Sequence, residues 1–280
     1  MKKKHKTLLI ILSAAVALNV ILNTFGNALE TVHYTLISDK IEQQVRIVFI
    51  TDLHSCTYGG DDQSEIWEEI HSAQPDIVLF GGDIVDYQGE TENTLQFMKR
   101  VGEEYPCAYS AGNHEEMRKD TNTVFADIAA LGIPVLHGDY KDLTVKEQTI
   151  RIFGIIDACN HPDQLEQCCR SLDADKYGIL LAHQPEQLDD IIAASENEKA
   201  HFDLVLSGHA HGGQWQIPHL LDQGLFAPDQ GLFPAFTNGQ RENSGTVQIV
   251  SRGLAKPLRM ILIPRIFNRP ELSIIDILPG

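Results

Sequence analysis

The sequence has few basic residues for its length. Lysine and arginine together number 22 against 39 aspartates and glutamates, which gives a formal net charge of −17, and four of the lysines lie within the first six residues. A chain this acidic is repelled by nucleic-acid phosphates unless a bound dication reverses the local field. We therefore predict that the protein binds no nucleic acid.

Cysteine is also scarce, and two common catalytic signatures are missing. The five cysteines form no Cys-x-x-Cys pair, and their odd number leaves at least one unpaired within the monomer. We expect most of them to be small core residues. Neither Gly-x-Ser-x-Gly nor Cys-x5-Arg occurs, so the sequence does not favour a covalent serine or cysteine nucleophile.

Charge is absent from residues 7–29, and most of residues 8–22 are aliphatic. At about 1.5 Å per residue, a helix over this stretch would extend roughly 35 Å, which exceeds a hydrocarbon core of about 30 Å. The preceding lysines and the lack of a small-x-small cleavage site favour an uncleaved signal anchor over a removed signal peptide. We predict a single-pass membrane anchor at residues 1–30 and a catalytic domain at 31–280, on the extracytoplasmic side of the cell membrane.

After this segment, strand-like and helix-like patterns alternate. With 43% hydrophobic residues and no internal repeat, the chain can form one domain with a sizeable core. The alternation predicts a layered α/β fold, in which ligands bind beyond the carboxyl ends of the strands. The predicted strands are 32–37, 45–51, 76–80, 108–110, 143–145, 149–155, 177–181, 204–206, 247–251 and 273–278. The predicted helices are 64–72, 92–101, 121–131, 164–172 and 188–194.

Polar clusters follow five of the predicted strands directly, so we expect them to meet at one edge of the sheet. Carboxylate and imidazole together suit ions such as Mn, Fe, Zn or Co, whereas calcium and magnesium sites use oxygen almost exclusively. In an extended Asp-x-His or His-x-His, both side chains point the same way and can bind one ion. The clusters are Asp52 and His54, Asp83, Asn113 and His114, His183, and His209 and His211.

Each cluster alone is weak evidence, but their order is specific. Asp-x-His, Gly-Gly-Asp, Gly-Asn-His-Glu, a single His and Gly-His-x-His follow one another, and this series resembles the calcineurin-like metallophosphoesterases. The resemblance implies a four-layer αββα sandwich and two divalent metal ions bridged by Asp83. It also implies the other ligands, which are Asp52, His54 and His211 for the first ion and Asn113, His183 and His209 for the second.

The resemblance further implies a role for His114, which would bind no metal. It would act on the substrate as a general acid for the leaving oxygen or as a charge partner for the phosphate. Asp86 would orient it, although a helix-start cap is an equally good interpretation of Asp86. Two ions about 3.5–4 Å apart can share a water, lower its pKa and hold the phosphate for in-line attack, so that no protein nucleophile is needed.

Four further segments resemble one branch of the family, the membrane-anchored or exported bacterial phosphoesterases of the YkuE and YaeI type. Ala255 departs from the pattern where a second glycine is expected after Arg252-Gly-Leu254, but no ligand lies there. The four segments are Gly208-His-Ala-His-Gly-Gly-Gln214, Gly231-Leu-Phe-Pro234, Ser251-Arg-Gly-Leu254 and Asn268-Arg-Pro-Glu-Leu272.

Residues 219–245 form a long stretch with Pro, Gly and scattered large apolar side chains. Long connections of this kind are often lids or binding loops, although a flap packed on the core is an equal alternative. We expect Phe226 and Phe233 to contact an amphipathic, lipid-linked phosphoester such as a lipid-precursor pyrophosphate. The predicted function is hydrolysis of phosphodiester or pyrophosphate bonds. The alternatives are a phosphomonoesterase of the same fold and an inactive, membrane-tethered metal-binding protein.

Overall fold

The computed structural model describes residues 28–196, 198, 200–256 and 265–280. The predicted anchor at residues 1–30 therefore lies outside the described residues, except for its last three. Within the described ranges, no helix has both the length and the apolarity needed to cross a membrane.

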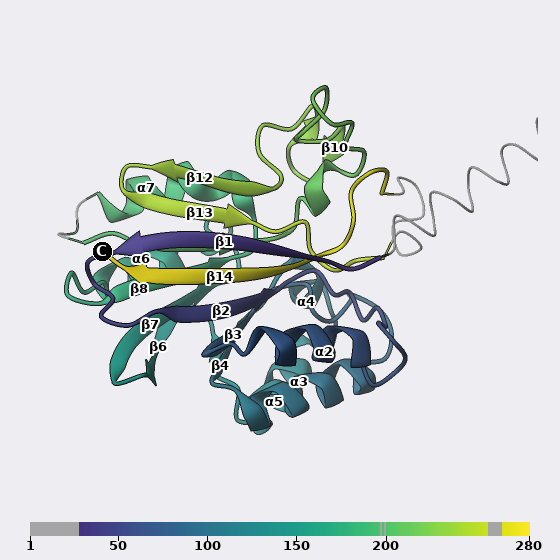
Figure 1. The fold of residues 1–280 in the computed structure, drawn as a ribbon, viewed down its shortest axis with the longest axis horizontal. Coiled ribbons are helices and arrows are strands. Elements are labelled where there is room, and N and C mark those ends of the chain that lie inside the picture. The colour runs from purple at the N-terminus through teal and green to yellow at the C-terminus, as the bar shows by residue number, and fades with distance from the viewer. Residues whose placement is uncertain (1–27, 197, 199, 257–264) are drawn as a thin grey trace, which may run out of the picture.

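Two six-stranded mixed sheets form the body (Figure 1). The first contains, in spatial order, β1 (Glu30–Ser38), β14 (Glu271–Pro279), β2 (Val45–Ile50), β3 (Ile77–Gly81), β4 (Cys107–Ser110) and β5 (Val135–Leu136). The second contains β12 (Gly239–Asn243), β13 (Thr246–Val250), β9 (Leu204–Ser207), β8 (Tyr177–Ala182), β7 (Gln148–Ile155) and β6 (Asp139–Val145). The strands β2 to β5 are parallel, as are β7, β8, β9 and β13.

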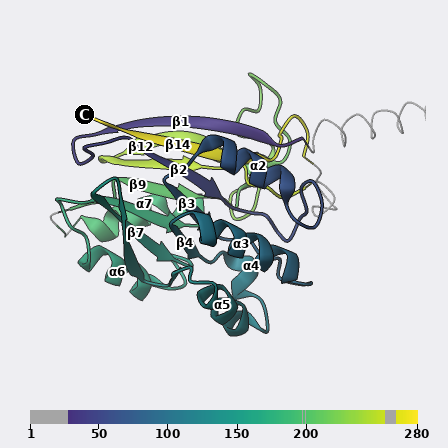
Figure 2. The same ribbon diagram turned by 60° about the horizontal axis from the view of Figure 1, so that its bottom comes forward.

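Helices cover the outer face of each sheet. The first sheet carries α2 (Ser64–Ala73), α3 (Glu92–Glu104) and α5 (Thr121–Ala130), and the second carries α6 (Pro162–Arg170) and α7 (Leu188–Ser195). Figure 2 shows α6 and α7 grouped beside β7 and β9, while α3 and α5 lie beside β4. The predicted four-layer αββα sandwich is therefore confirmed.

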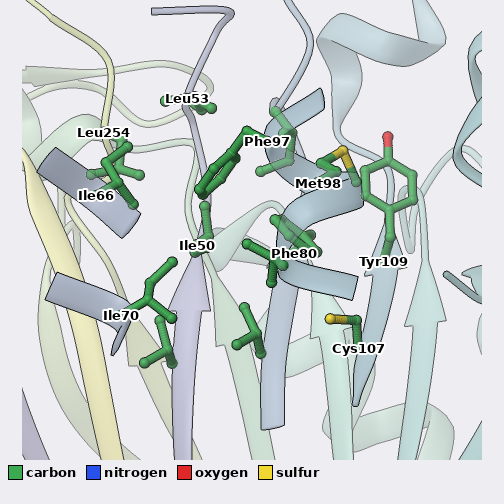
Figure 3. Packing of buried hydrophobic residues seen from close by; sticks show 14 of the residues in the cluster. Ile50, Leu53, Ile66, Ile70, Phe80, Phe97, Met98, Cys107, Tyr109 and Leu254 are labelled. Atoms are coloured by element: carbon green, nitrogen blue, oxygen red, sulfur yellow. The ribbon is translucent and has the colours of Figure 1, made fainter. Parts of the chain in front are cut away.

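Three apolar clusters hold the layers together. The central one lies between the sheets and takes residues from both, including Phe49 and Leu79 from one and Ile152 and Leu206 from the other. Its strands read as continuous apolar runs because they are covered on both faces. The outer clusters lie beneath the helices. Figure 3 shows the one under α2 and α3, where Phe80 meets Phe97 edge to face with ring centroids 6.4 Å apart.

The structure differs from the sequence prediction mainly in residues 219–245. This stretch contains β12 and a small two-stranded hairpin, β10 (Phe226–Ala227) with β11 (Gly231–Leu232). A four-residue helix, α4 (Asn113–Glu116), also follows β4 directly. These elements are too short or too polar to give a periodic hydrophobic signal, and the ladder hydrogen bonds to β13 hold β12 in place.

Candidate metal centre

The predicted ligands lie on tight turns at the carboxyl ends of parallel strands from both sheets. Asp52 and His54 follow β2, Asp83 follows β3, and Asn113 and His114 form the start of α4 after β4. From the second sheet, His183 follows β8, and His209 and His211 follow β9. The backbone amide of Gly208 donates to the carbonyl of His183, and that of Leu254 donates to Thr51, so the turns of the two sheets are joined.

Several of these turns are conformationally costly. Asp52, His54, Asp83, His209 and His211 all have positive φ, between 47° and 64°, a region that residues other than glycine rarely adopt. The glycines beside them are needed for close approach. A Cβ on Gly82 would lie 2.6 Å from Nδ1 of His183, and one on Gly208 would lie 2.2 Å from Oδ2 of Asp52. Backbone strain of this kind concentrates at functional sites.

Two carboxylate oxygens lie at the centre of the cluster. Oδ1 of Asp52 is 3.8 Å from Nε2 of His54, from Nε2 of His183 and from Nδ1 of His211. Oδ2 of Asp83 is 3.2 Å from Nε2 of His183 and 3.6 Å from Nε2 of His54. These spacings gather carboxylate and imidazole donors into two neighbouring groups, Asp52 with His54 and His211, and Asp83 with His183 and His209.

Three buried donor atoms in the cluster have no hydrogen-bond partner among the described residues. They are Nε2 of His54, Oδ1 of Asn113 and Nε2 of His183. In the neutral ring of His183, Nδ1–H donates to the carbonyl of Gly81 at 2.8 Å, so Nε2 carries the lone pair that a metal would bind. A buried polar atom without a partner is costly, and bound divalent cations would satisfy these atoms. The residues present therefore fit bound divalent metal.

Charge in the cluster is arranged to hold a cation. Burial disfavours the charged form of Asp83, yet the imidazoles of His183, His54 and His114 outweigh it and hold the pKa of Asp83 well below its usual range. Burial also opposes protonation of His183, but the Asp83 and Asp52 carboxylates raise the pKa of His183 to about 10. Positive charge between these carboxylates is thus favoured, whether a proton or a metal carries it.

His114 lies on the open side of the cluster. Its Nδ1–H donates to Oδ1 of Asp86 at 2.8 Å, and its Nε2 is 3.9 Å from Oδ2 of Asp83. Burial raises the pKa of the Asp86 carboxyl, but contacts with His114 and His54 more than offset this and leave it below the ordinary value. Asp86 is not the cap of α3, which begins at Glu92. The ring of Tyr87 meets the His114 imidazole edge to face, with centroids 5.2 Å apart.

Glu115 is a central residue to which the sequence analysis gave no role. It is fully buried, and its two oxygens accept the backbone amides of four residues, namely Asp83, Ile84, Val85 and Gly112, at 2.7–3.0 Å. This carboxylate fixes the turn that carries Asp83 against the turn that carries Asn113. The motif Gly-Asn-His-Glu contained the signal, since an acidic residue there could accept the amides of the neighbouring turn.

Asp229 is a second residue to which the sequence motifs assign no role. It connects residues 219–245, called here the flap, to the metal-ligand cluster. It lies between β10 and β11, and Oδ2 accepts the Nε2–H of His209 at 2.8 Å, which leaves the other ring nitrogen for a metal. Histidines that bind metal usually donate their second N–H in this way. Phe226 is half-buried in β10 and Phe233 is exposed. Their expected role in substrate binding stays a prediction.

Arg265 lies fully buried behind His211. Its Nη2 donates to the carbonyls of Arg252 and Gly253 and lies 3.5 Å from Nδ1 of His211. Asn268 adds a hydrogen bond from Nδ2 to the carbonyl of His211 at 2.6 Å. Burial lowers the pKa of Arg265 to about 10. Arg265 and Asn268 therefore hold the turn after β9 in place. Both lie far from His211 in the sequence, so no local motif indicates their role.

Comparison with known proteins gives a consistent family. The calcineurin-like phosphoesterase family matches residues 45–213. The chain is 30% identical over 234 residues to the putative metallophosphoesterase F40B5.2 of Caenorhabditis elegans, a match that covers 77% of this chain but only 46% of the relative. It is 27% identical over 250 residues to the uncharacterized metallophosphoesterase YkuE of Bacillus subtilis, covering 85% of this chain and 84% of the relative.

A third relative, from Danio rerio, is named a transmembrane protein with metallophosphoesterase domain. It is 27% identical over 186 residues, which cover 61% of this chain and 41% of the relative. The family match spans more than half of the chain and ends just beyond the last histidine of the cluster. The chain therefore belongs to the calcineurin-like phosphoesterase family.

Proposed function

We propose that the protein hydrolyses phosphodiester or pyrophosphate bonds with two divalent ions drawn from Mn, Fe, Zn and Co. Each ion has three ligands of its own and shares the carboxylate of Asp83. The ligands are Asp52, His54 and His211 for the first ion and Asn113, His183 and His209 for the second.

The observation that carries this proposal is the set of bare donor atoms around Asp83. Nε2 of His54 belongs to the first proposed group, whereas Nε2 of His183 and Oδ1 of Asn113 belong to the second. Oδ2 of Asp83 approaches the first two of these atoms at 3.6 and 3.2 Å. A carboxylate between two unsatisfied donor sets is what a shared ligand requires, and a single ion would leave one set unsatisfied.

Two such ions, when bound, lower the pKa of a water and neutralise phosphate oxygens during displacement. The protein itself supplies His114 as the group that acts on the substrate. Its Nδ1–H is committed to Asp86 at 2.8 Å, so the ring is held with Nε2 toward the Asp83 side of the cluster. A partly exposed imidazole held in this orientation can donate a proton to a leaving oxygen or pair with the phosphate.

Net charge supports a phosphodiester over a monoester. The chain carries −17, and its field repels a phosphate monoester, with a charge of about −1.5 to −2 near pH 7, more than a singly charged diester.

The direct test compares wild type with Asp83→Asn in hydrolysis of bis-(p-nitrophenyl) phosphate with Mn²⁺. We expect a loss of at least about 100-fold, because partners outside the ligand shell alone typically account for 10–100-fold. Asp62→Asn, on an exposed loop, is the matched control and should keep full activity. A wild type no faster than Asp83→Asn would point instead to an inactive metal-binding protein, and a single metal per chain by elemental analysis would contradict the shared-ligand arrangement.

We further propose a lipid-linked substrate, with Phe226 and Phe233 beside its apolar part. The support is the position of their hairpin, since Asp229 at its turn already contacts His209. Replacing both phenylalanines with serine should lower turnover of a lipid phosphodiester more than that of bis-(p-nitrophenyl) phosphate. Equal losses on the two substrates would contradict this part of the proposal.

The location is also part of the proposal, with residues 1–30 as a single-pass anchor and the catalytic domain on the extracytoplasmic side. It is supported by the uncharged stretch after the N-terminal lysines and by the relative named as a transmembrane protein. Protease added to intact cells without a wall should digest the domain while a cytoplasmic marker survives. A domain that is digested only after lysis would reverse the orientation.

A further inference from the structure

Exposed apolar side chains gather on one part of the molecule. Of ten exposed large hydrophobic residues in the described part of the chain, six lie in two segments, residues 215–233 and the residues just before β14. Four of the six are at least two-thirds exposed, which is unusual for side chains of this size. The six, called here the lobe surface, are Trp215 (37%), Ile217 (41%), Leu220 (74%), Leu232 (67%), Phe233 (69%) and Phe267 (70%).

Backbone contacts join these residues into one lobe. Trp215 forms a parallel bridge with Ile266, the neighbour of Phe267. The amide of Leu225 donates to Gly213, and the amide of Phe233 donates to Leu225, each at 2.8 Å. The hairpin that carries Leu232 and Phe233 is therefore fixed beside the segment that carries Trp215. The lobe surface is a built feature of the fold and does not consist of unrelated exposed residues.

The lobe lies where the uncharged N-terminal stretch joins the body. Arg269, two residues after Phe267, donates from Nε to the carbonyl of Ala28 and from Nη2 to that of Leu29. The amide of Glu30 donates to Pro270 at 2.9 Å. Figure 1 shows the start of β1 and the lobe around β10 at the same end of the molecule. Residues 7–27, which precede this junction, carry no charge.

The charge of the lobe identifies the kind of surface that it fits. Residues 214–239 include two aspartates and no lysine or arginine, so an anionic headgroup layer would not attract them. Large apolar side chains with a tryptophan are instead suited to the boundary between headgroups and acyl chains.

We propose that the lobe surface inserts into the interface of a lipid bilayer by hydrophobic contact. Asp229, in the turn between β10 and β11, links the same hairpin to His209. Insertion therefore brings the metal cluster to the membrane surface and orients the domain. This inference concerns orientation and is independent of which phosphoester is hydrolysed.

The test uses the only two tryptophans of the chain, Trp67 and Trp215. The full chain is reconstituted in phosphatidylcholine vesicles with brominated acyl chains, which quench nearby indoles. In a Trp67→Phe variant, Trp215 should lose most of its emission, and bromine near the headgroup end should quench more than bromine near the methyl end. In Trp215→Phe, the remaining Trp67 packs in the helix layer beneath Arg100 and should stay bright.

Matched substitutions separate insertion from mere proximity to the membrane. In the Trp67→Phe background, Leu220→Ser with Phe233→Ser should abolish most of the quenching, whereas Ile37→Ser, 74% exposed near the end of β1, should not change it. Replacing phosphatidylcholine with an anionic lipid should not strengthen quenching. Hydrolysis of bis-(p-nitrophenyl) phosphate by the same vesicles reports on the proposed function separately.

Two outcomes would overturn the proposal. In one, Trp215 stays bright in brominated vesicles and remains accessible to a water-soluble quencher, which means that the lobe faces solvent. In the other, Trp215 is shielded from the soluble quencher but is not quenched by bromine, and shielding grows with protein concentration. That result would assign the lobe surface to contact between copies of the chain.

Discussion

The space between the two sheets and the edge where their strands end are equally buried but built differently. Between the sheets, Phe49, Ile152 and Leu206 are apolar and fully buried, and they stabilise the fold by leaving water. At the edge, Asp52 and Asp83 are just as buried, and their turns have positive φ. The buried charges and strained turns at the edge are destabilising. The apolar interior offsets this cost, so the fold remains stable with the charged cluster in place.

A substitution that damages only the apolar interior should have the largest effect on stability. Phe49→Ala should lower the free energy of unfolding by about 3–5 kcal/mol, through lost burial and a cavity. Metal stoichiometry at low temperature should be unchanged, because Phe49 belongs to the apolar cluster between the sheets and is not one of the proposed ligands. Chemical denaturation with and without metal measures both. A variant of normal stability that lost metal would show that the two regions are not separable.

Glu115→Gln should damage only the metal-ligand cluster at the edge where the strands end. The amide nitrogen of Gln would face two of the backbone N–H groups that Glu115 now accepts, so the turn of Asp83 should loosen. We expect metal affinity to fall about 10–100-fold, as for other supports of metal ligands. Isothermal titration calorimetry provides the measurement, and Glu103→Gln, in an exposed pair with Lys99, is the control. Unchanged affinity would contradict the bracing role.

Metal binding at the edge should also release protons, which a change in the apolar interior would not do. Because Asp83 raises the pKa of His183 to about 10, metal must displace a proton at neutral pH, and affinity should rise roughly tenfold per pH unit for each proton released. In the metal-free protein, the same shift stabilises the fold below about pH 6.5 and this contribution is lost as the pH rises towards 10. Calorimetry in buffers of different ionisation enthalpy counts the protons. No release near neutral pH would contradict the prediction.

The smallest expected effect concerns the flap. Asp229→Asn weakens the acceptor of the His209 Nε2–H, and we expect metal affinity to fall by about tenfold or less. Asp222→Asn, on the same flap, changes only the acceptor of the His219 amide and should leave affinity unchanged. Equal metal affinity in the two variants would show that the flap does not support a metal ligand.

Much of the fold could be predicted because its strands and helices carry strong periodic signals. The expected strand at 45–51 is observed as Val45–Ile50, and the expected helix at 64–72 as Ser64–Ala73. The hairpin of Phe226 and the edge strand at Gly239 were missed, since each depends on pairing with distant backbone. Pairing partners of this kind leave no local pattern in the sequence.

The residues of the candidate site likewise fall into those that could be predicted from the sequence and those that could not. The predicted ligands converge because each follows a strand, and parallel strands bring their carboxyl ends to one edge. Glu115, Asp229 and Arg265 could not be assigned from the sequence, because their roles are hydrogen bonds to residues in other turns. Motif order predicts which residues can bind metal, whereas the residues that hold them in place depend on the three-dimensional packing.

The pairing of β1 with β14 has a consequence for how the domain forms. Strand β14 lies between β1 and β2, with Glu30 paired to Glu271 and Phe49 to Ser273. While the chain is being synthesised, β1 has no hydrogen-bonded neighbour in its sheet until residues 271–279 emerge. The sheet is therefore completed late, through contacts of high sequence separation that form slowly. During synthesis, the growing chain should consequently be a target for chaperones that bind unpaired strands.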